Sequence, residues 1–190
     1  MAEAYNWMTA QLIPAAEKEV LEEENGPAGR EEPQVFTHRL RCQVDASWTH
    51  AEKKAGLGFV LLRDDHKVLI GTRNDDNASS PLHAEAKGLI WTMEMMKDKG
   101  YHTMHFETDC LQLLKLIQRE EEWPSMEAEL EEIWILSKVF DGFSISFLPR
   151  GMNHRADLLA KAARTRSDTV VSVYDETPVW LANIASPLES

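Results

Sequence analysis

Alternation of apolar and polar residues predicts three β-strands in the first half of the chain. In residues 41–48 every second side chain is apolar, which is the period of a strand buried on at least one face. Two further strand-like runs, residues 56–63 and 68–72, are separated by the turn-forming residues 64–67. Because the connections between these runs are short, we expect the three strands to form an antiparallel meander.

A helical period replaces the alternation after residue 80. Apolar residues recur at three- and four-residue spacing over residues 82–96, which predicts a helix that turns one side to the core. Ser80 and Pro81 are typical of a helix start, with the serine as N-cap and the proline at the first helical position. Gly100 is expected to end the helix.

The same two periods predict the rest of the fold. Strands are expected at residues 103–108 and 143–148, and helices at residues 109–119, 125–139 and, after an Asn153 cap, up to residue 166. The order is then three strands, a helix, a strand, two helices, a strand and a helix. This order predicts an α/β fold in which helices flank a mixed sheet.

Composition separates this region from two flanks. Residues 1–35 are acidic and contain glycine and proline, so we interpret them as a linker with at most one loose helix. The folded domain is expected to span residues 36–166. Residues 167–190 form a C-terminal tail, whose Val-rich segment and Trp180 either return to the domain surface or stay loose.

The negative charge belongs mostly to those flanks. The chain has a formal net charge of −12, of which residues 1–35 contribute −6 and residues 167–190 contribute −4. The central region, residues 36–166, carries twenty acids and eighteen bases. A nucleic-acid partner, whose phosphates attract basic surfaces, is therefore not excluded by the overall charge.

No targeting or membrane signal is visible. No apolar run approaches the roughly 20 residues of a membrane span, and the N-terminus lacks the basic-then-apolar order of a signal peptide. Cys42 and Cys110 are too few for a zinc cluster and are expected to be reduced. We therefore expect an intracellular protein, nuclear or cytoplasmic, without a membrane partner; its oligomeric state is not indicated.

Two acids stand where a carboxylate is unfavourable. Asp45 lies in the middle of a predicted strand, a position where Asp is depleted, although an Asp at a strand edge can bond to a neighbouring loop. Glu85 projects from the apolar stripe of its helix, three residues after Leu82 and four before Leu89. Burial of an unpaired carboxylate costs several kcal/mol, so Glu85 indicates a metal ligand, a buried salt bridge or the edge of the stripe.

Two further acids have equally good local explanations. Asp109 begins a capping-box sequence that ends at Gln112, and Asp157 lies in the first helical turn, where the helix dipole favours any acid. If the strand at residues 103–108 runs parallel beside the strand at residues 41–48, Asp109 lies near Asp45. Convergence of the four acids on bound metal ions is then the interpretation that explains them together.

Four segments resemble the motifs of the ribonuclease H family. They are residues 44–47 (Val-Asp-Ala-Ser), residues 83–86 (His-Ala-Glu-Ala), residues 107–110 (Glu-Thr-Asp-Cys) and residues 150–160, which include Asn153 and Asp157. They are most similar to the reverse-transcriptase-associated domains of plant non-LTR retroelements and their domesticated relatives. The resemblance covers about residues 36–166 and implies the RNase H-like fold, a five-stranded mixed sheet with three antiparallel and two parallel strands, flanked by helices.

The resemblance also implies a reaction. A metal-dependent endonuclease would hydrolyse the RNA strand of an RNA–DNA hybrid with two Mg²⁺ or Mn²⁺ ions. Asp45 would bridge both ions, Glu85 and Asp109 would hold one, and Asp157 would help to hold the other. Carboxylates without His or Cys suit these hard cations.

Contacts to nucleic acid are expected from basic and polar residues near these motifs, although each can equally be an ordinary surface group. RNA would be selected through 2′-hydroxyl contacts and minor-groove shape. The candidate residues are Lys53, Lys54, Arg73, Arg150, Asn153, Arg155 and Lys161.

Departures from the family leave two alternatives open. The basic helical insertion with which some bacterial members grip their substrate is absent, the stretch before residue 143 is acidic, and Gly151 stands where related plant domains usually have Glu. A catalytically weak or inactive module that binds nucleic acid or protein is therefore the second hypothesis. An exonuclease of the same superfamily is a weaker one, because it would normally have an acid at the position of Ser47.

Overall fold

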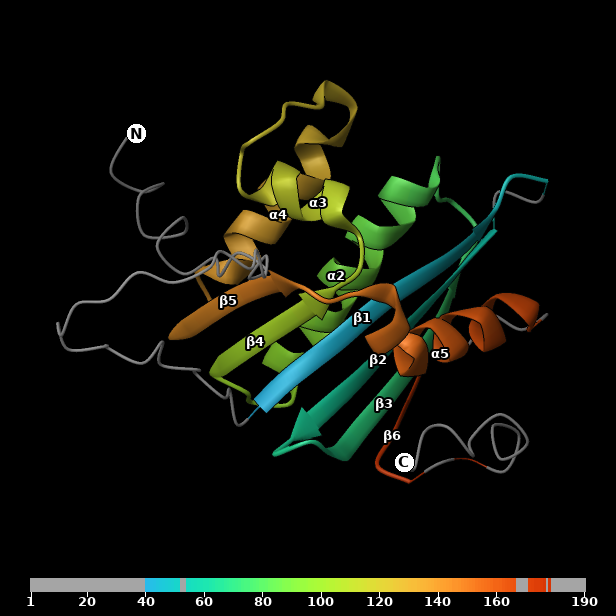
Figure 1. Ribbon diagram of the computed structural model, residues 1–190, viewed down its shortest axis with the longest axis vertical. Helices are drawn as coiled ribbons and strands as arrows, with labels where there is room; N and C mark the ends of the chain where they lie inside the picture. Colours follow the sequence, from blue (N-terminus) through green and yellow to red (C-terminus); the bar gives the residue numbers. More distant parts are fainter. Residues whose placement is uncertain (1–39, 52–53, 167–170, 177, 179–190) are drawn as a thin grey trace, which may run out of the picture.

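A computed structural model describes residues 40–51, 54–166, 171–176 and 178 (Figure 1). The strands and α-helices follow the order predicted from sequence, with one strand added at the end. They are β1 (Leu40–Thr49), β2 (Lys54–Arg63), β3 (His66–Asp75), α2 (Pro81–Asp98), β4 (Thr103–Thr108), α3 (Leu111–Ile117), the short 3₁₀ helix η2 (Pro124–Met126), α4 (Glu127–Ser137), β5 (Gly142–Phe147), the 3₁₀ helix η3 (Arg150–Met152), α5 (His154–Thr165) and β6 (Ser172–Tyr174).

The strands form one mixed sheet in the order β5-β4-β1-β2-β3-β6. β1, β2 and β3 form the expected antiparallel meander, while β4 pairs in parallel with both β1 and β5. The predicted combination of a meander and two parallel strands is therefore confirmed.

The number of strands predicted from sequence is wrong by one. β6 comes from the predicted tail and pairs antiparallel with β3, so among the described residues the sheet has six strands rather than five. It is only three residues long, which is too short for alternation to be recognised in sequence. Trp180, for which we expected either a return to the surface or a loose position, lies outside the described residues.

Helices cover both faces of the sheet (Figure 1). Leu57, Phe59 and Leu61 of β2 belong to the large core shared with α2, α3 and α4. The intervening residues Val60 and Leu62 belong to a small second core under α5. The alternation of β2 thus separates the two cores, because successive side chains of a strand point to opposite faces.

The ends of α2 agree with the signals in the sequence. The Ser80 hydroxyl accepts a hydrogen bond from the His83 backbone N–H at 3.3 Å, and Pro81 occupies the first turn. Gly100 follows the helix with a φ of +77°, a conformation that costs glycine little. This helix is therefore held at both ends by local interactions.

Close packing of α5 on β2 requires glycine at Gly58. A Cβ atom there would lie 2.5 Å from the Ala160 backbone nitrogen and 2.6 Å from the Ala156 carbonyl oxygen. We expect Gly58→Ala to push α5 away from the sheet and to lower the free energy of unfolding by about 1–3 kcal/mol, measured by urea denaturation. The matched control is Gly151→Ala, where a Cβ atom meets nothing within 4 Å. Equal stability of the two variants would contradict this packing.

Within the described part of the chain, no helix is both long and apolar enough to cross a membrane.

Candidate metal centre

The parallel pairing of β1 and β4 brings the first two acids together. Val44 of β1 pairs with Thr108, the last residue of β4. Asp45 follows Val44 on β1, and Asp109 directly follows the end of β4. Asp45 is 5% exposed, and Asp109 is partly buried just beyond the end of β4. The prediction that a parallel β4 would bring Asp109 close to Asp45 is confirmed.

α2 adds the third acid. Glu85 lies in its second turn between the buried residues Ala84 and Ala86. One carboxylate oxygen from each of Asp45, Glu85 and Asp109 can be chosen so that all lie within 4.8 Å of one another. Oxygens at such separations can contact one shared cation.

Asp109 does not make the capping interaction that its sequence also allowed. α3 begins at Leu111, so that Cys110 rather than Asp109 occupies the N-cap position. The Asp109 carboxylate instead belongs to the acidic cluster. Of the two explanations for this residue, the structure therefore excludes helix capping.

The cluster is electrostatically unfavourable without a cation. Burial, followed by the charges of Asp109 and Asp157, raises the pKa of Asp45 from its usual 3.8 to about 8. Burial and the charges of Asp45 and Asp109 likewise raise the pKa of Glu85 well above its usual range. The Ala46 backbone N–H opposes both shifts, because its hydrogen bond favours the charged forms.

The chemistry of the donor atoms fits a hard divalent cation. Three carboxylates offer only oxygen ligands, which Mg²⁺ and Mn²⁺ prefer. The thiol of Cys110 is not part of this group of ligand atoms, and burial and then the charge of Glu85 raise its pKa to about 11. A bound cation would also offset the repulsion that raises the pKa of Asp45.

Asp157, the fourth predicted acid, lies beside the cluster rather than in it. It occupies the first turn of α5, and its carboxylate is 2.7 Å from Lys161 Nζ and 4.0 Å from the Arg150 guanidinium. It is close enough to contribute to the raised pKa of Asp45. The structure therefore brings three of the four acids into one cluster and holds the fourth next to it between two bases.

The sequence predicted that the Asn153 side chain would cap α5, but the structure shows no such capping bond. Asn153 occupies the N-cap position and is fully buried. Its amide nitrogen donates to the Val44 carbonyl oxygen at 3.0 Å, which ties the start of α5 to the strand residue before Asp45. Sequence alone could not reveal this, because capping and a long-range bond need the same residue type.

The other predicted nucleic-acid contacts differ in accessibility. Arg150 is 81% exposed and lies close enough to Glu85 to lower the pKa of that acid. Lys54 donates to the Arg166 carbonyl oxygen at 2.8 Å. Arg73 and Arg155 are partly buried, and Lys161 is exposed. Lys53 lies outside the described residues.

A second buried acid, Glu107, is neutralised differently and serves as a comparison. Arg41 and Gln43 both donate to its carboxylate, at 3.1 Å in each case. Arg41 also contacts Asp65. Glu107 lies two residues before Asp109, yet it has a cation and an amide as partners. The cluster around Asp45 is therefore not simply a feature of acids on this sheet.

The chain shares its fold with ribonucleases H. RNase H1 from the halophilic archaeon Halobacterium salinarum NRC-1 matches with a TM-score of 0.62 and 26% identity, over 66% of this chain and 96% of its own. The N-terminal RNase H domain of a Mycobacterium tuberculosis protein, solved as a fusion with maltose-binding protein, gives 0.58 and 20%, over 66% and 98%. LC11-RNase H1 in complex with an RNA/DNA hybrid gives 0.60 and 16%, over 66% and 96%.

Sequence comparison leads to the same group. No curated protein sequence matches the chain. The reverse transcriptase-like family, however, matches over residues 43–163, a range that begins in β1, ends in α5 and includes the four acids. The match covers well over half of the 190 residues. The chain therefore belongs to the reverse transcriptase-like family, and its domain has the ribonuclease H-like fold.

Proposed function

We propose that the protein is a metal-dependent endonuclease that hydrolyses the RNA strand of RNA–DNA hybrids. The observation that carries the proposal is the cluster of Asp45, Glu85 and Asp109 within the family match. Three acids from separate elements converge at an unfavourable electrostatic cost, which a bound cation offsets. Structural acids have no need of such an arrangement, as the paired Glu107 illustrates.

The proposed site holds two Mg²⁺ or Mn²⁺ ions through the four acids. Asp45 would contact both ions, Glu85 and Asp109 would hold one, and Asp157 would help to hold the other. Bound ions would supply an activated water and stabilise the leaving oxygen of an in-line displacement. Since Asp45 and Glu85 have raised pKa values, these acids must release protons when the site is loaded.

Contacts to the nucleic acid are proposed for several basic residues of the chain. Arg150 is the strongest candidate, because it is exposed and lies beside Asp157. Lys53, Lys54, Arg73 and Arg155 complete the proposed set. Asn153, which is fully buried, would support the site through its hydrogen bond to Val44 rather than by touching the nucleic acid. LC11-RNase H1, which shares the fold, was solved with an RNA/DNA hybrid, and the proposal extends that class of ligand to this chain.

A weak or inactive nucleic-acid-binding or interaction module is the competing function. It is favoured by the acidic stretch at residues 119–134, which carries seven acids and one base where a basic grip on substrate would be expected. The retroelement origin and the compartment that the sequence suggested stay predictions.

A cleavage assay separates the two functions. We expect the full chain to cut an RNA–DNA hybrid, labelled on the RNA strand, when Mg²⁺ or Mn²⁺ is present, and to stop when EDTA removes the ions. Matched RNA–RNA and DNA–DNA duplexes should remain intact, because the DNA duplex has no 2′-hydroxyls and the RNA duplex lacks a DNA strand and differs from the hybrid in groove shape. Binding of the hybrid without cutting, at any concentration of either metal, would favour the competing module.

A further inference from the structure

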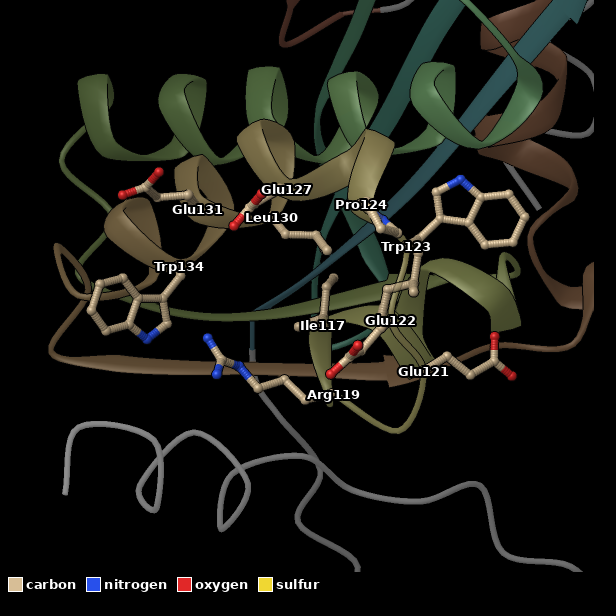
Figure 2. A pocket seen from close by; sticks show the side chains of 11 residues that line it. Ile117, Arg119, Glu121, Glu122, Trp123, Pro124, Glu127, Leu130, Glu131 and Trp134 are labelled. Atoms are coloured by element: carbon tan, nitrogen blue, oxygen red, sulfur yellow. The ribbon is translucent and has the colours of Figure 1, made fainter. Parts of the chain in front are cut away.

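A pocket of about 560 Å³ lies between α3, η2 and α4, and the catalytic acids are not among its lining residues. Figure 2 shows the indole rings of Trp134 and Trp123 at its two ends, with Leu130 and Ile117 between them. Trp123 is 45% exposed, and Ile135, which follows on α4, is 53% exposed. We call this surface the Trp123–Trp134 pocket.

The Trp123–Trp134 pocket has the composition of a protein-binding site. Tryptophan is enriched among the residues that contribute most binding energy in interfaces, and large exposed apolar side chains are otherwise unfavourable. Lys138 of the same chain already lies over one face of the Trp134 ring, 3.1 Å from its centroid, so a partner would contact the other apolar surfaces of the pocket. Apolar side chains can therefore be bound here.

Four glutamates surround the apolar floor. Glu127 and Glu131 come from α4, while Glu121 and Glu122 come from the segment after α3 (Figure 2). Arg119 is the single base among the residues that line the pocket. Glu127 and Glu131 are four residues apart on one helix, a like-charge spacing that destabilises an isolated helix by about 0.2–0.5 kcal/mol. Glu121 is already paired with Lys115, 3.1 Å away, and the other three glutamates make the rim complementary to a cationic partner.

The negative charge of the rim disfavours a nucleic acid, residues 1–35 of this chain and a second copy as occupants of the pocket. Phosphates of a nucleic acid would meet four carboxylates, and residues 1–35 of this chain, with a net charge of −6, would be repelled as well. A second copy bound through the same surface would place the acidic rim against itself, because a two-fold interface is self-complementary. The remaining class is a different protein with basic residues.

We propose that the Trp123–Trp134 pocket binds a segment of another protein in which apolar side chains are flanked by Lys or Arg. Apolar side chains of that segment contact Leu130 and the two indoles, and its bases contact the glutamate rim. η2, which contributes Pro124 to the pocket, also contacts α2, the helix that carries Glu85: the Ser125 carbonyl oxygen is 3.2 Å from His83 Nε2.

NMR titration of the full chain tests the proposal with a defined probe. The probe is a short synthetic peptide with Leu at helical i, i+3, i+4 and i+7 positions and Lys or Arg elsewhere. We expect it to shift the indole N–H resonances of Trp123 and Trp134, assigned with Trp→Phe variants. Trp123→Ala should weaken binding about tenfold and Glu131→Lys about fivefold. The matched control is Glu132→Lys, an equal charge change at the next exposed residue of α4, which does not line the pocket and should have little effect.

Several results would overturn the proposal. Equal weakening by Glu131→Lys and Glu132→Lys would mean that the peptide senses only the net charge of the chain. Equal binding of a peptide with Glu in place of Lys and Arg would contradict a basic partner. The absence of an indole shift with the basic peptide would contradict it as well. Shifts of the same indoles on addition of an RNA–DNA hybrid would assign the pocket to nucleic acid. Shifts that depend on protein concentration alone would assign it to a second copy. None of these results bears on the cleavage assay.

Discussion

Asp45→Asn is expected to reduce hydrolysis of the RNA strand by about 1,000-fold or more. Metal ions stabilise the charge of such a transition state by several kcal/mol, and each 1.36 kcal/mol is a factor of ten in rate. Asp45 belongs to the acidic cluster, and Asp109 and Asp157 are both close enough to affect its pKa. An amide of the same shape retains one oxygen but loses the charge that holds a cation. The initial rate of cleavage of a labelled hybrid measures the effect.

The control for this change is Asp98→Asn, the same substitution at the exposed end of α2. It should leave the rate unchanged, and circular dichroism should show both variants folded. Cleavage by Asp45→Asn at the rate of the unsubstituted protein would remove the proposed site, even if the chain itself cuts hybrids.

The same substitution is expected to stabilise the metal-free protein, increasingly so as the pH rises. Asp45 has a pKa of about 8 in the folded chain and about 3.9 when unfolded, so between these values only the folded state holds the proton. The contribution of protonated Asp45 to the stability of the folded chain is therefore fully present below about pH 4 and is lost as the pH rises through about 8. Asn is neutral throughout and avoids this loss. We expect Asp45→Asn to melt several degrees above the unsubstituted protein near pH 8 and at about the same temperature near pH 4.

Thermal melting in EDTA, followed from about pH 4 to about pH 9, measures this difference. Because Glu85 also has a raised pKa and lies in the same cluster, the two acids titrate together, and the gain should be spread over the whole range. Added Mg²⁺ should narrow the gap by stabilising only the unsubstituted protein. A melting difference that stays constant with pH would mean that Asp45 is ionised in the folded chain at all of these values.

Local patterns predicted most of the elements, because alternation and capping act over a few residues. β4 begins and ends where the alternation predicted, and α2 begins at the expected Pro81 after its Ser80 cap. The sixth strand was missed, because three residues carry no period and their conformation depends on the free edge of β3. Prediction failed there because pairing with a distant strand, rather than local preference, determines the structure.

The residues of the site also divide into those that local sequence singled out and those that only the fold explained. Sequence alone singled out Asp45 and Glu85, since a mid-strand acid and an acid in an apolar stripe are each unfavourable without a partner. For Asp109 it left capping and clustering equally open, and for Asn153 it suggested a cap that the structure does not contain. Those residues could be resolved only when parallel pairing of β1 and β4 brought distant segments together.

What the sequence by itself determined is therefore most of the elements, the family and the acids that need an explanation. The tertiary structure decided which acids share a cluster: Asp45, Glu85 and Asp109 meet, while Asp157 lies beside them between Arg150 and Lys161. The physical reason is the distance along the chain over which each interaction acts. Backbone preferences and burial periods are properties of neighbouring residues, whereas the repulsion that makes these carboxylates candidates for a metal exists only once the sheet has formed.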